Sequence, residues 1–192
     1  MEAYRRRSKD YIQLLGTLEA TSAEDRLLVQ DWGRGVTGRI LDAGCGPGQW
    51  TGFLASLGLD VEGCDPLPEF VDHARCVHPE LSFRRGAVED LASEPGRYGG
   101  ILCWYSLIHL PPAQVPEVFR VLHGALAPGG TLLLGFYEGE DQERFDHAVA
   151  PAYFRDPEAV SQQLREAGFS LLRTERRRAP GARPHAALVA AR

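Results

Sequence analysis

Two aspartates and a glycine-spaced turn are the residues whose types and spacing most directly suggest chemistry. Asp42 closes an apolar run over 39–43, and glycines follow it at alternate positions: Gly44, Gly46 and Gly48. Glycine accepts positive φ and, because it lacks a Cβ, lets a ligand lie against the backbone. An apolar helix face opens at Trp50, so unpaired N–H groups point toward such a ligand. Asp65 ends a second apolar run about 20 residues later, where an acid in a doubly wound sheet reaches a ribose diol. This combination indicates a nucleoside ligand.

The details of the turn exclude two kinds of nucleotide site. A dinucleotide fingerprint needs a third glycine at position 49, which is Gln49 here, so an NAD-linked oxidoreductase is disfavoured. A phosphate-binding P-loop needs a lysine, but the single lysine of the chain, Lys9, lies far upstream. The pattern from Asp42 to Gly48 instead resembles motif I of the class I S-adenosylmethionine-dependent methyltransferases. The resemblance implies that Asp42 helps hold the amino group of the cofactor, which carries positive charge.

The same resemblance implies contacts along later segments. Asp65 would bind the ribose hydroxyls and Pro66 would pack beside the adenine. Many relatives carry an aspartate where this chain has Ala87, so we expect adenine to be read by backbone N–H near Val88, with Glu89 as a side-chain candidate. A solvated loop is the alternative for Glu89. The full set of expected cofactor contacts is Tyr11, Asp42, Gly44, Cys45, Gly46, Gly48, Trp50, Asp65, Pro66, Ala87, Val88, Glu89, Tyr105 and Ser106.

The segment 103–110 follows a nearly continuous apolar run, at the sheet edge where open α/β sheets bind ligands. By resemblance Tyr105 and Ser106 line the methionine side and His109 faces the reacting methyl group. His109 is the candidate general base because its unperturbed pKa lies near neutrality. The alternatives are a core position for Trp104 and a packing role for His109 at a helix start.

In the resembled family the acceptor pocket is closed by an N-terminal helix and by an insert after the fifth strand. Tyr4 and Tyr11 resemble N-terminal tyrosines that fold over the cofactor. Tyr4 is also a candidate acceptor contact, together with His147 and Tyr153 of the insert, with ordinary lid packing as the alternative for the insert residues. We therefore expect a helical cap over 1–35 and one methyltransferase domain over 36–192, with a lid insert at about 138–156.

The elements that must position these residues alternate between strand and helix, which predicts a mostly parallel sheet with helices on both faces. Asp156-Pro157 is expected to begin a helix that Gly168 ends, and Thr21-x-x-Glu24 to cap a leading helix. The predicted strands are 39–43, 61–64, 81–85, 101–105, 131–137, 169–175 and 185–190. Their number and order resemble the seven-stranded, Rossmann-like methyltransferase fold, whose last strand is antiparallel.

Composition limits the partners. The 192 residues carry a formal net charge of −5, which disfavours general attraction to nucleic acid or anionic membranes. The arginine runs 5–7 and 176–178 are accordingly expected to be solvated surface. No apolar stretch approaches the roughly 20 residues of a membrane span, and the N-terminus lacks the apolar core of a secretory signal, so we expect a cytoplasmic protein. His73, Cys76 and His78 lack a fourth ligand, so no metal is expected.

These observations predict in-line transfer of a methyl group from S-adenosylmethionine to a small-molecule acceptor, leaving S-adenosylhomocysteine. One alternative is an RNA or protein methyltransferase that acts with a partner. Another is a catalytically silent subunit that binds the cofactor. The acceptor, the methylated atom and the oligomeric state are left open by the sequence.

Overall fold

The computed structural model describes residues 17–147, 151–179 and 181–192. The strands are β1 (Ile40–Ala43), β2 (Val61–Asp65), β3 (Ser82–Arg85), β4 (Tyr98–Trp104), β5 (Leu126–Tyr137), β6 (Arg144–Phe145), β7 (Ala152–Tyr153), β8 (Ser170–Arg177) and β9 (His185–Ala191). The helices are η1 (Leu18–Ala20), α2 (Ala23–Gly35), α3 (Gln49–Ser56), α4 (Pro68–Val77), η2 (Val88–Ser93), η3 (Pro112–Gln114), α5 (Val115–Ala125) and α6 (Pro157–Glu166). Among these described residues, no helix has the length and apolar character needed to cross a membrane.

Seven strands form one sheet in the order β3-β2-β1-β4-β5-β9-β8. Strands β1 to β5 pair in parallel, whereas β9 is antiparallel to both β5 and β8. The predicted seven-stranded sheet with an antiparallel last strand is therefore confirmed. The strand order reverses between β1 and β4, and in open α/β sheets ligands bind outside the carboxyl ends of the strands at such a point.

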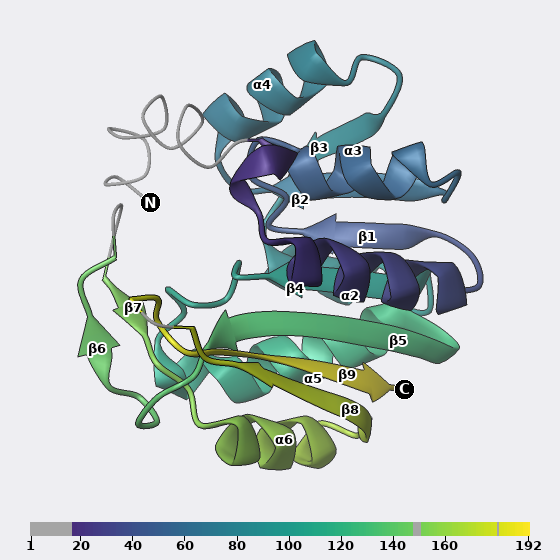
Figure 1. The fold of residues 1–192 in the computed structure, drawn as a ribbon. Helices are drawn as coiled ribbons and strands as arrows, with labels where there is room; N and C mark the ends of the chain where they lie inside the picture. Colours follow the sequence, from purple (N-terminus) through teal and green to yellow (C-terminus); the bar gives the residue numbers. More distant parts are fainter. Residues whose placement is uncertain (1–16, 148–150, 180) are drawn as a thin grey trace.

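Helices cover both faces of the sheet, with α2 and α3 on one side and α5 and α6 on the other (Figure 1). Successive side chains of a strand point to opposite faces of the sheet, so neighbouring residues pack against different helix layers. Ile40 belongs to the buried cluster that contains Leu54 of α3, whereas its neighbour Leu41 belongs to the cluster of Phe119 on α5. The helix predicted to begin at Asp156 does so, because the Asp156 carboxylate accepts hydrogen bonds from the first free amides of α6.

The predicted capping box of the leading helix is wrong by one residue. Ser22 is the N-cap of α2, and its Oγ accepts a hydrogen bond of 3.0 Å from the Asp25 amide. Thr21 instead donates its hydroxyl to the Leu18 carbonyl at 2.6 Å and so closes η1. Both residues have a suitable hydroxyl, and the turn before the helix decides which one serves.

Two predicted strands begin earlier than the sequence indicated. β4 starts at Tyr98 and β5 at Leu126, so Gly99-Gly100 and Gly129-Gly130 lie inside strands. A Cβ on Gly99 would lie 1.9 Å from the Thr37 carbonyl oxygen. The chain before β1 approaches so closely that only glycine fits here. Because glycine usually weakens a strand, the sequence alone places the start of the strand too late.

The insert after β5 contains β6 and β7, which pair antiparallel with Arg144 opposite Tyr153. It lies beyond the end of the main sheet, at the left of the view, on the side where the parallel strands end (Figure 1). The described part of the insert therefore stands next to the edge at which the predicted site residues gather.

Candidate active site

The glycine turn after β1 is held against β2 by its own backbone. The amides of Gly44 and Cys45 both donate to the Cys64 carbonyl, at 2.7 and 3.0 Å. A Cβ on Gly44 would lie 2.3 Å from the Cβ of Ser106, and φ at this residue is +79°. Gly44 therefore lets the turn approach the segment after β4, which only glycine permits at this spacing.

Gly46 is the glycine of the turn that opens onto empty space. Its φ is +54°, and a Cβ there would meet no atom within 4 Å. It lines a cavity of about 460 Å³ at the carboxyl ends of β1, β2 and β4, which we call the turn cavity. Bare backbone beside a cavity is the arrangement that lets a ligand lie on the main chain.

Asp65 presents its carboxylate to the turn cavity in a fixed orientation. Oδ2 accepts a hydrogen bond from the Gly46 amide at 3.0 Å, and Oδ1 accepts one from the Leu67 amide at 2.8 Å. Burial raises the pKa of this carboxyl to about 6, and the two amide hydrogen bonds act in the opposite direction. A carboxylate has about four lone-pair sites, so two amides leave capacity for a diol.

Asp42 lies beneath the turn and lines neither this cavity nor the larger one beside it. The side chain is buried, and its Oδ2 accepts a hydrogen bond of 2.7 Å from the Thr51 hydroxyl of α3. Burial raises the pKa of Asp42 to about 7. Cys45 is turned away as well and belongs to a buried cluster with Val71 and Phe83. The Asp42 and Cys45 side chains therefore pack beneath the turn and do not line the cavities.

The structure brings most of the other predicted cofactor contacts together in one place. The predicted residues that line the turn cavity are Gly44, Gly46, Asp65, Pro66, Ala87, Val88, Glu89, Tyr105, Ser106 and His109. Gly48 does not line it; this glycine is the N-cap of α3 at φ +94° and packs closely against Phe83. Tyr4 and Tyr11 lie outside the described residues.

A larger cavity of about 930 Å³ adjoins the first, and we call it the aromatic cavity. Trp50 lines it, whereas Trp104 and Tyr105 line both cavities. Trp104 is only 9% exposed and belongs to a buried cluster. It is therefore both a core residue and part of the cavity walls. Tyr105 has φ of +55°, a left-handed conformation that is uncommon for a bulky residue. Such strain collects at functional sites.

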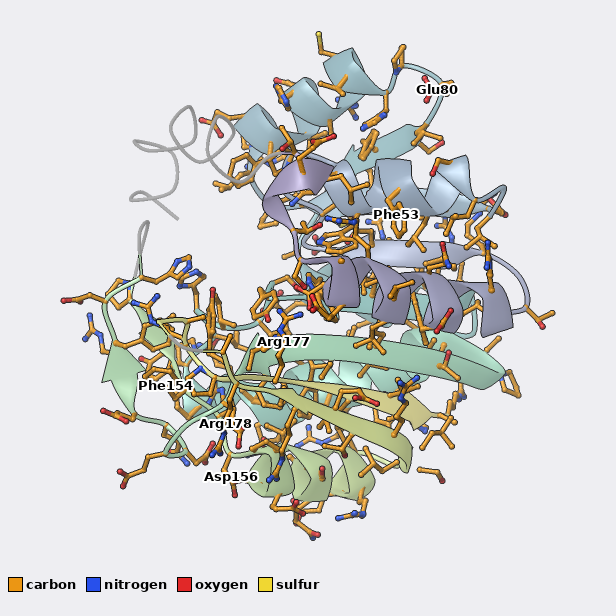
Figure 2. All side chains as sticks on the ribbon, viewed as in Figure 1. Phe53, Glu80, Phe154, Asp156, Arg177 and Arg178 are labelled. Carbon is orange, nitrogen blue, oxygen red and sulfur yellow. The ribbon has the colours of Figure 1, made fainter. Side chains whose placement is uncertain are left out.

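Side chains from three distant segments meet at Tyr105. Its hydroxyl lies 2.5 Å from Nδ1 of His185 at the start of β9. Arg177 at the end of β8 donates toward the same Nδ1 at 3.5 Å and forms an ion pair of 2.7 Å with Asp25 of α2. In the all-side-chain view Arg177 lies toward the middle of the molecule, whereas Arg178 is lower, near Asp156 (Figure 2). The prediction that this arginine run is solvated surface is therefore wrong for Arg177.

Two histidine rings lie side by side where the cavities adjoin. His109 lines the turn cavity and His147 the aromatic cavity, with ring centroids 5.3 Å apart. Nδ1 of His109 lies 2.8 Å from the Pro151 carbonyl, which can only accept, so the proton of the neutral ring is on Nδ1. Burial lowers the pKa of His109. Burial, His109 and Arg183 lower the pKa of His147 to about 4, so both rings are neutral at pH 7.

Tyr153, predicted to contact the acceptor, lines neither of these two cavities. Its amide donates to the Ile108 carbonyl at 2.9 Å, and the Arg155 guanidinium lies 5.4 Å from its ring centroid. In the described structure Tyr153 thus ties the insert to the segment after β4.

The residues of the aromatic cavity that sequence reasoning missed include Asp25, Arg177, Arg183 and His185. Asp25 and Arg177 are 152 positions apart, so no local pattern connects them. The structure shows why Arg177 differs from its neighbours. In β8 Glu175 and Arg177 are both half-buried while Arg176 is exposed, the alternation expected when one face of a strand is covered.

Comparisons with known proteins agree with this geometry. Residues 40–130 match the family described as methyltransferase domain. The ubiquinone biosynthesis O-methyltransferase of Xanthomonas campestris is 40% identical over 101 residues, which cover 50% of this chain and 41% of that protein. An uncharacterized methyltransferase of Mycobacterium tuberculosis is 36% identical over 127 residues, which cover 66% of this chain and 51% of that protein. The chain thus spans about half the length of the curated relatives it matches.

A solved structure shares the fold over nearly the whole chain. It is the 1,6-didemethyltoxoflavin-N1-methyltransferase of Burkholderia thailandensis, solved with 1,6-didemethyltoxoflavin and S-adenosylhomocysteine bound. Its TM-score is 0.79 at 21% identity, covering 99% of this chain and 87% of that chain. Residues 40–130 are therefore similar to the methyltransferase domain family, and the fold of the whole chain is that of a methyltransferase solved with S-adenosylhomocysteine bound.

Proposed function

We propose that this protein binds S-adenosylmethionine in the turn cavity and transfers its methyl group to a small molecule in the aromatic cavity. The observation that carries the proposal is the junction of the two cavities at Trp104 and Tyr105. A displacement between two bound molecules requires that both reach one point in a fixed orientation. Adjoining cavities that share a strained residue supply such a point.

The residues of the turn cavity fit the cofactor. The Asp65 carboxylate would accept hydrogen bonds from the ribose hydroxyls, and the bare backbone of Gly46 would lie against the methionine part. The Ala87 amide already donates to Asp90 Oδ2 at 2.8 Å, so the amides that follow it, at Val88 and Glu89, would read the adenine edge. When bound, the cofactor supplies a methyl group on a sulfonium, which is an excellent leaving group.

The chain itself has to align the acceptor, exclude water and take up a proton. An acceptor hydroxyl or amine must lose its proton as it bonds to the methyl carbon. His109 would accept that proton on Nε2, because Nδ1 holds its own proton toward the Pro151 carbonyl. The lowered pKa keeps the ring neutral, and therefore competent as a base, at pH 7.

The segments 1–35 and 138–156 would close the site as a cap and a lid. In the described part of the first, Ser22 and Asp25 already line the aromatic cavity, and in the second, His147 lines it. Around a bound acceptor, these residues would shield the methyl group from water.

A small molecule is favoured as the acceptor because the chain carries a net charge of −5 and so opposes general binding of nucleic acid. We place the protein in the cytoplasm, since all four of its cysteines are free and three are buried, as is usual in a reducing compartment.

The proposal is tested by methyl transfer. The purified protein is incubated with S-adenosylmethionine carrying a tritiated methyl group and a panel of phenols, aromatic acids, amines and thiols. The expected result is labelled product and S-adenosylhomocysteine in equal amounts with one acceptor class. Tight cofactor binding with no transfer to any small molecule, or transfer only to RNA or protein, would contradict the proposal.

A further inference from the structure

We propose that the aromatic cavity selects a planar acceptor that carries a carboxylate or another fixed anion, with Arg183 as the anchor of that anion. This inference rests on the proposed function and adds a substrate class to it. It follows from the walls of the cavity, from its charges, and from one buried donor.

The walls of the aromatic cavity are flat rings. Those that line it are Trp50, Trp104, Tyr105 and Tyr137. The centroids of Tyr105 and Tyr137 are 4.9 Å apart, and those of Trp50 and Trp104 are 5.7 Å apart. These rings pack on one another, and a planar ligand would make offset or edge contacts with the parts of them that line the cavity.

The charges that face this cavity do not cancel. Its charged lining residues are Asp25, Arg177 and Arg183. Asp25 is already paired with Arg177 at 2.7 Å, so these two neutralise one another. Arg183 donates to the carbonyl oxygen of Asp146 at 3.2 Å and lies over the Phe145 ring at 4.8 Å, and within the described residues no carboxylate pairs with it. The described lining therefore keeps one positive charge, which attracts an anion and repels an ammonium.

A buried donor supports the same ligand. Arg177 can only donate toward Nδ1 of His185, so the proton of the neutral ring lies on Nε2. Burial lowers the pKa of His185, which favours this neutral form. The residue is 8% exposed, and Nε2 has no hydrogen-bond partner among the described residues. A buried donor without a partner is uncommon and calls for an acceptor atom on a ligand.

The positions of these groups also give the ligand a direction. The Tyr137 ring lies between the two ends of the cavity, 5.9 Å from the Arg183 guanidinium and 4.9 Å from the Tyr105 ring. An anion held by Arg183 would place a planar ring along Tyr137. The opposite edge of that ring would then face Tyr105, where the two cavities meet.

Three matched probes test the inference: 3,4-dihydroxybenzoate, catechol and 3,4-dihydroxybenzylamine, which share one ring and differ in charge. Binding of S-adenosylhomocysteine is first measured by calorimetry, and each probe is then titrated into the saturated protein. We expect the acid to bind at least about tenfold more tightly than the amine, with catechol between them. Arg183→Gln is expected to erase the difference. The control Arg120→Gln, an exposed arginine of α5 paired with Glu117, is expected to keep it.

Equal or tighter binding of the amine would overturn the inference. So would failure of all three probes to bind the saturated protein, or a difference that survives in Arg183→Gln. Failure of S-adenosylhomocysteine to bind would instead overturn the proposed function itself, so the two failures are distinguishable.

Discussion

The two cavities differ in the chemical groups that line them. The polar end of the turn cavity is formed by the glycine backbone and by the Asp65 carboxylate at the ends of adjacent strands, and apolar side chains line the rest. The aromatic cavity is made of side chains from α2, the segments after β4 and β5, and the β8–β9 region. Backbone geometry is encoded by a local pattern of glycines, whereas a side-chain cluster depends on the whole fold. The first can therefore be recognised from local sequence, whereas the second has to be read from the folded structure.

This comparison predicts that variants separate into two classes. Changes in the turn cavity should alter cofactor affinity, and changes in the aromatic cavity should alter acceptor binding. Changes at the junction should alter turnover or the acceptor KM and leave cofactor affinity nearly unchanged. The predictions below test this separation in order of decreasing effect.

The largest effect is expected from Asp65→Ala. Charged hydrogen bonds contribute about 1.5–3 kcal/mol each, so loss of two to the ribose should raise the Kd for S-adenosylhomocysteine on the order of 100-fold or more. The matched control is Glu89→Ala, an exposed residue that lines the same cavity, for which a small change is expected. Calorimetry measures both Kd values, and thermal unfolding shows whether each variant is folded. An unchanged Kd in Asp65→Ala would remove Asp65 from the cofactor site.

The next effect is expected at the junction of the cavities. His109→Ala should lower kcat about 100-fold, the usual contribution of a general base, with little change in cofactor Kd. His123→Ala is the control, since this histidine of α5 packs on Phe169 just before β8 and lines neither cavity. The pKa of His109 is lowered from its ordinary value, and a base must be unprotonated. Wild-type kcat should therefore fall only at a pH below the ordinary histidine pKa of about 6.5, and the variant should lose that dependence. An identical pH profile in the variant would exclude His109 as the base.

A third prediction separates Asp42 from Asp65. The folded pKa of Asp42 is about 7, above the unfolded value, so the native state binds the extra proton between about pH 4 and 7. Stability should consequently fall as pH rises through that window. Asp42→Asn keeps an acceptor for Thr51 and removes the titration. The pKa shift of Asp42 corresponds to at most about 4 kcal/mol, at about 1.4 kcal/mol per unit, and burial of the Asn amide offsets part of it. The free energy of unfolding at pH 8 should therefore rise on the order of 2 kcal/mol.

Urea unfolding at pH 5 and pH 8 measures this effect, with the exposed Asp72→Asn as control. A variant that is less stable than the wild type at pH 8 would contradict the raised pKa of Asp42. A variant that binds the cofactor about 100-fold more weakly would show that Asp42 acts in the cofactor site after all.

The smallest effect is expected from Tyr105→Phe. The ring and its packing remain, and only the hydrogen bond to His185 is lost. A neutral hydrogen bond contributes about 0.5–1.5 kcal/mol, so the acceptor KM should rise about 3–10-fold while the cofactor Kd stays the same. Steady-state kinetics with the best acceptor gives the KM. A larger change in cofactor Kd than in acceptor KM would contradict the assignment of this hydroxyl to the acceptor side.

Much of the fold and of the turn cavity could be predicted from local sequence. Apolar runs marked the strands, and Asp156-Pro157 marked the start of α6, because caps and proline act over one or two residues. The position of Asp42 could also have been predicted. In a strand, Asp42 shares a face with Ile40, which α3 covers, so its side chain points beneath the turn.

The aromatic cavity could not be predicted in the same way. Tyr105, Arg177 and His185 come together only when β8 and β9 are added to the sheet beside β5. Composition alone predicts that the run 176–178 is solvated surface. Whether one arginine in it turns inward depends on Asp25, a carboxylate of α2 at the opposite end of the chain.

The central claim is that the turn cavity binds the cofactor independently of the aromatic cavity. It is tested most directly by calorimetric titration of S-adenosylhomocysteine into the wild type, Asp65→Ala and Arg183→Gln, with NAD as the control ligand. We predict binding to the wild type and to Arg183→Gln, none to Asp65→Ala at the same concentrations, and no binding of NAD. Failure of the wild type to bind, or loss of binding in Arg183→Gln but not in Asp65→Ala, would contradict the account.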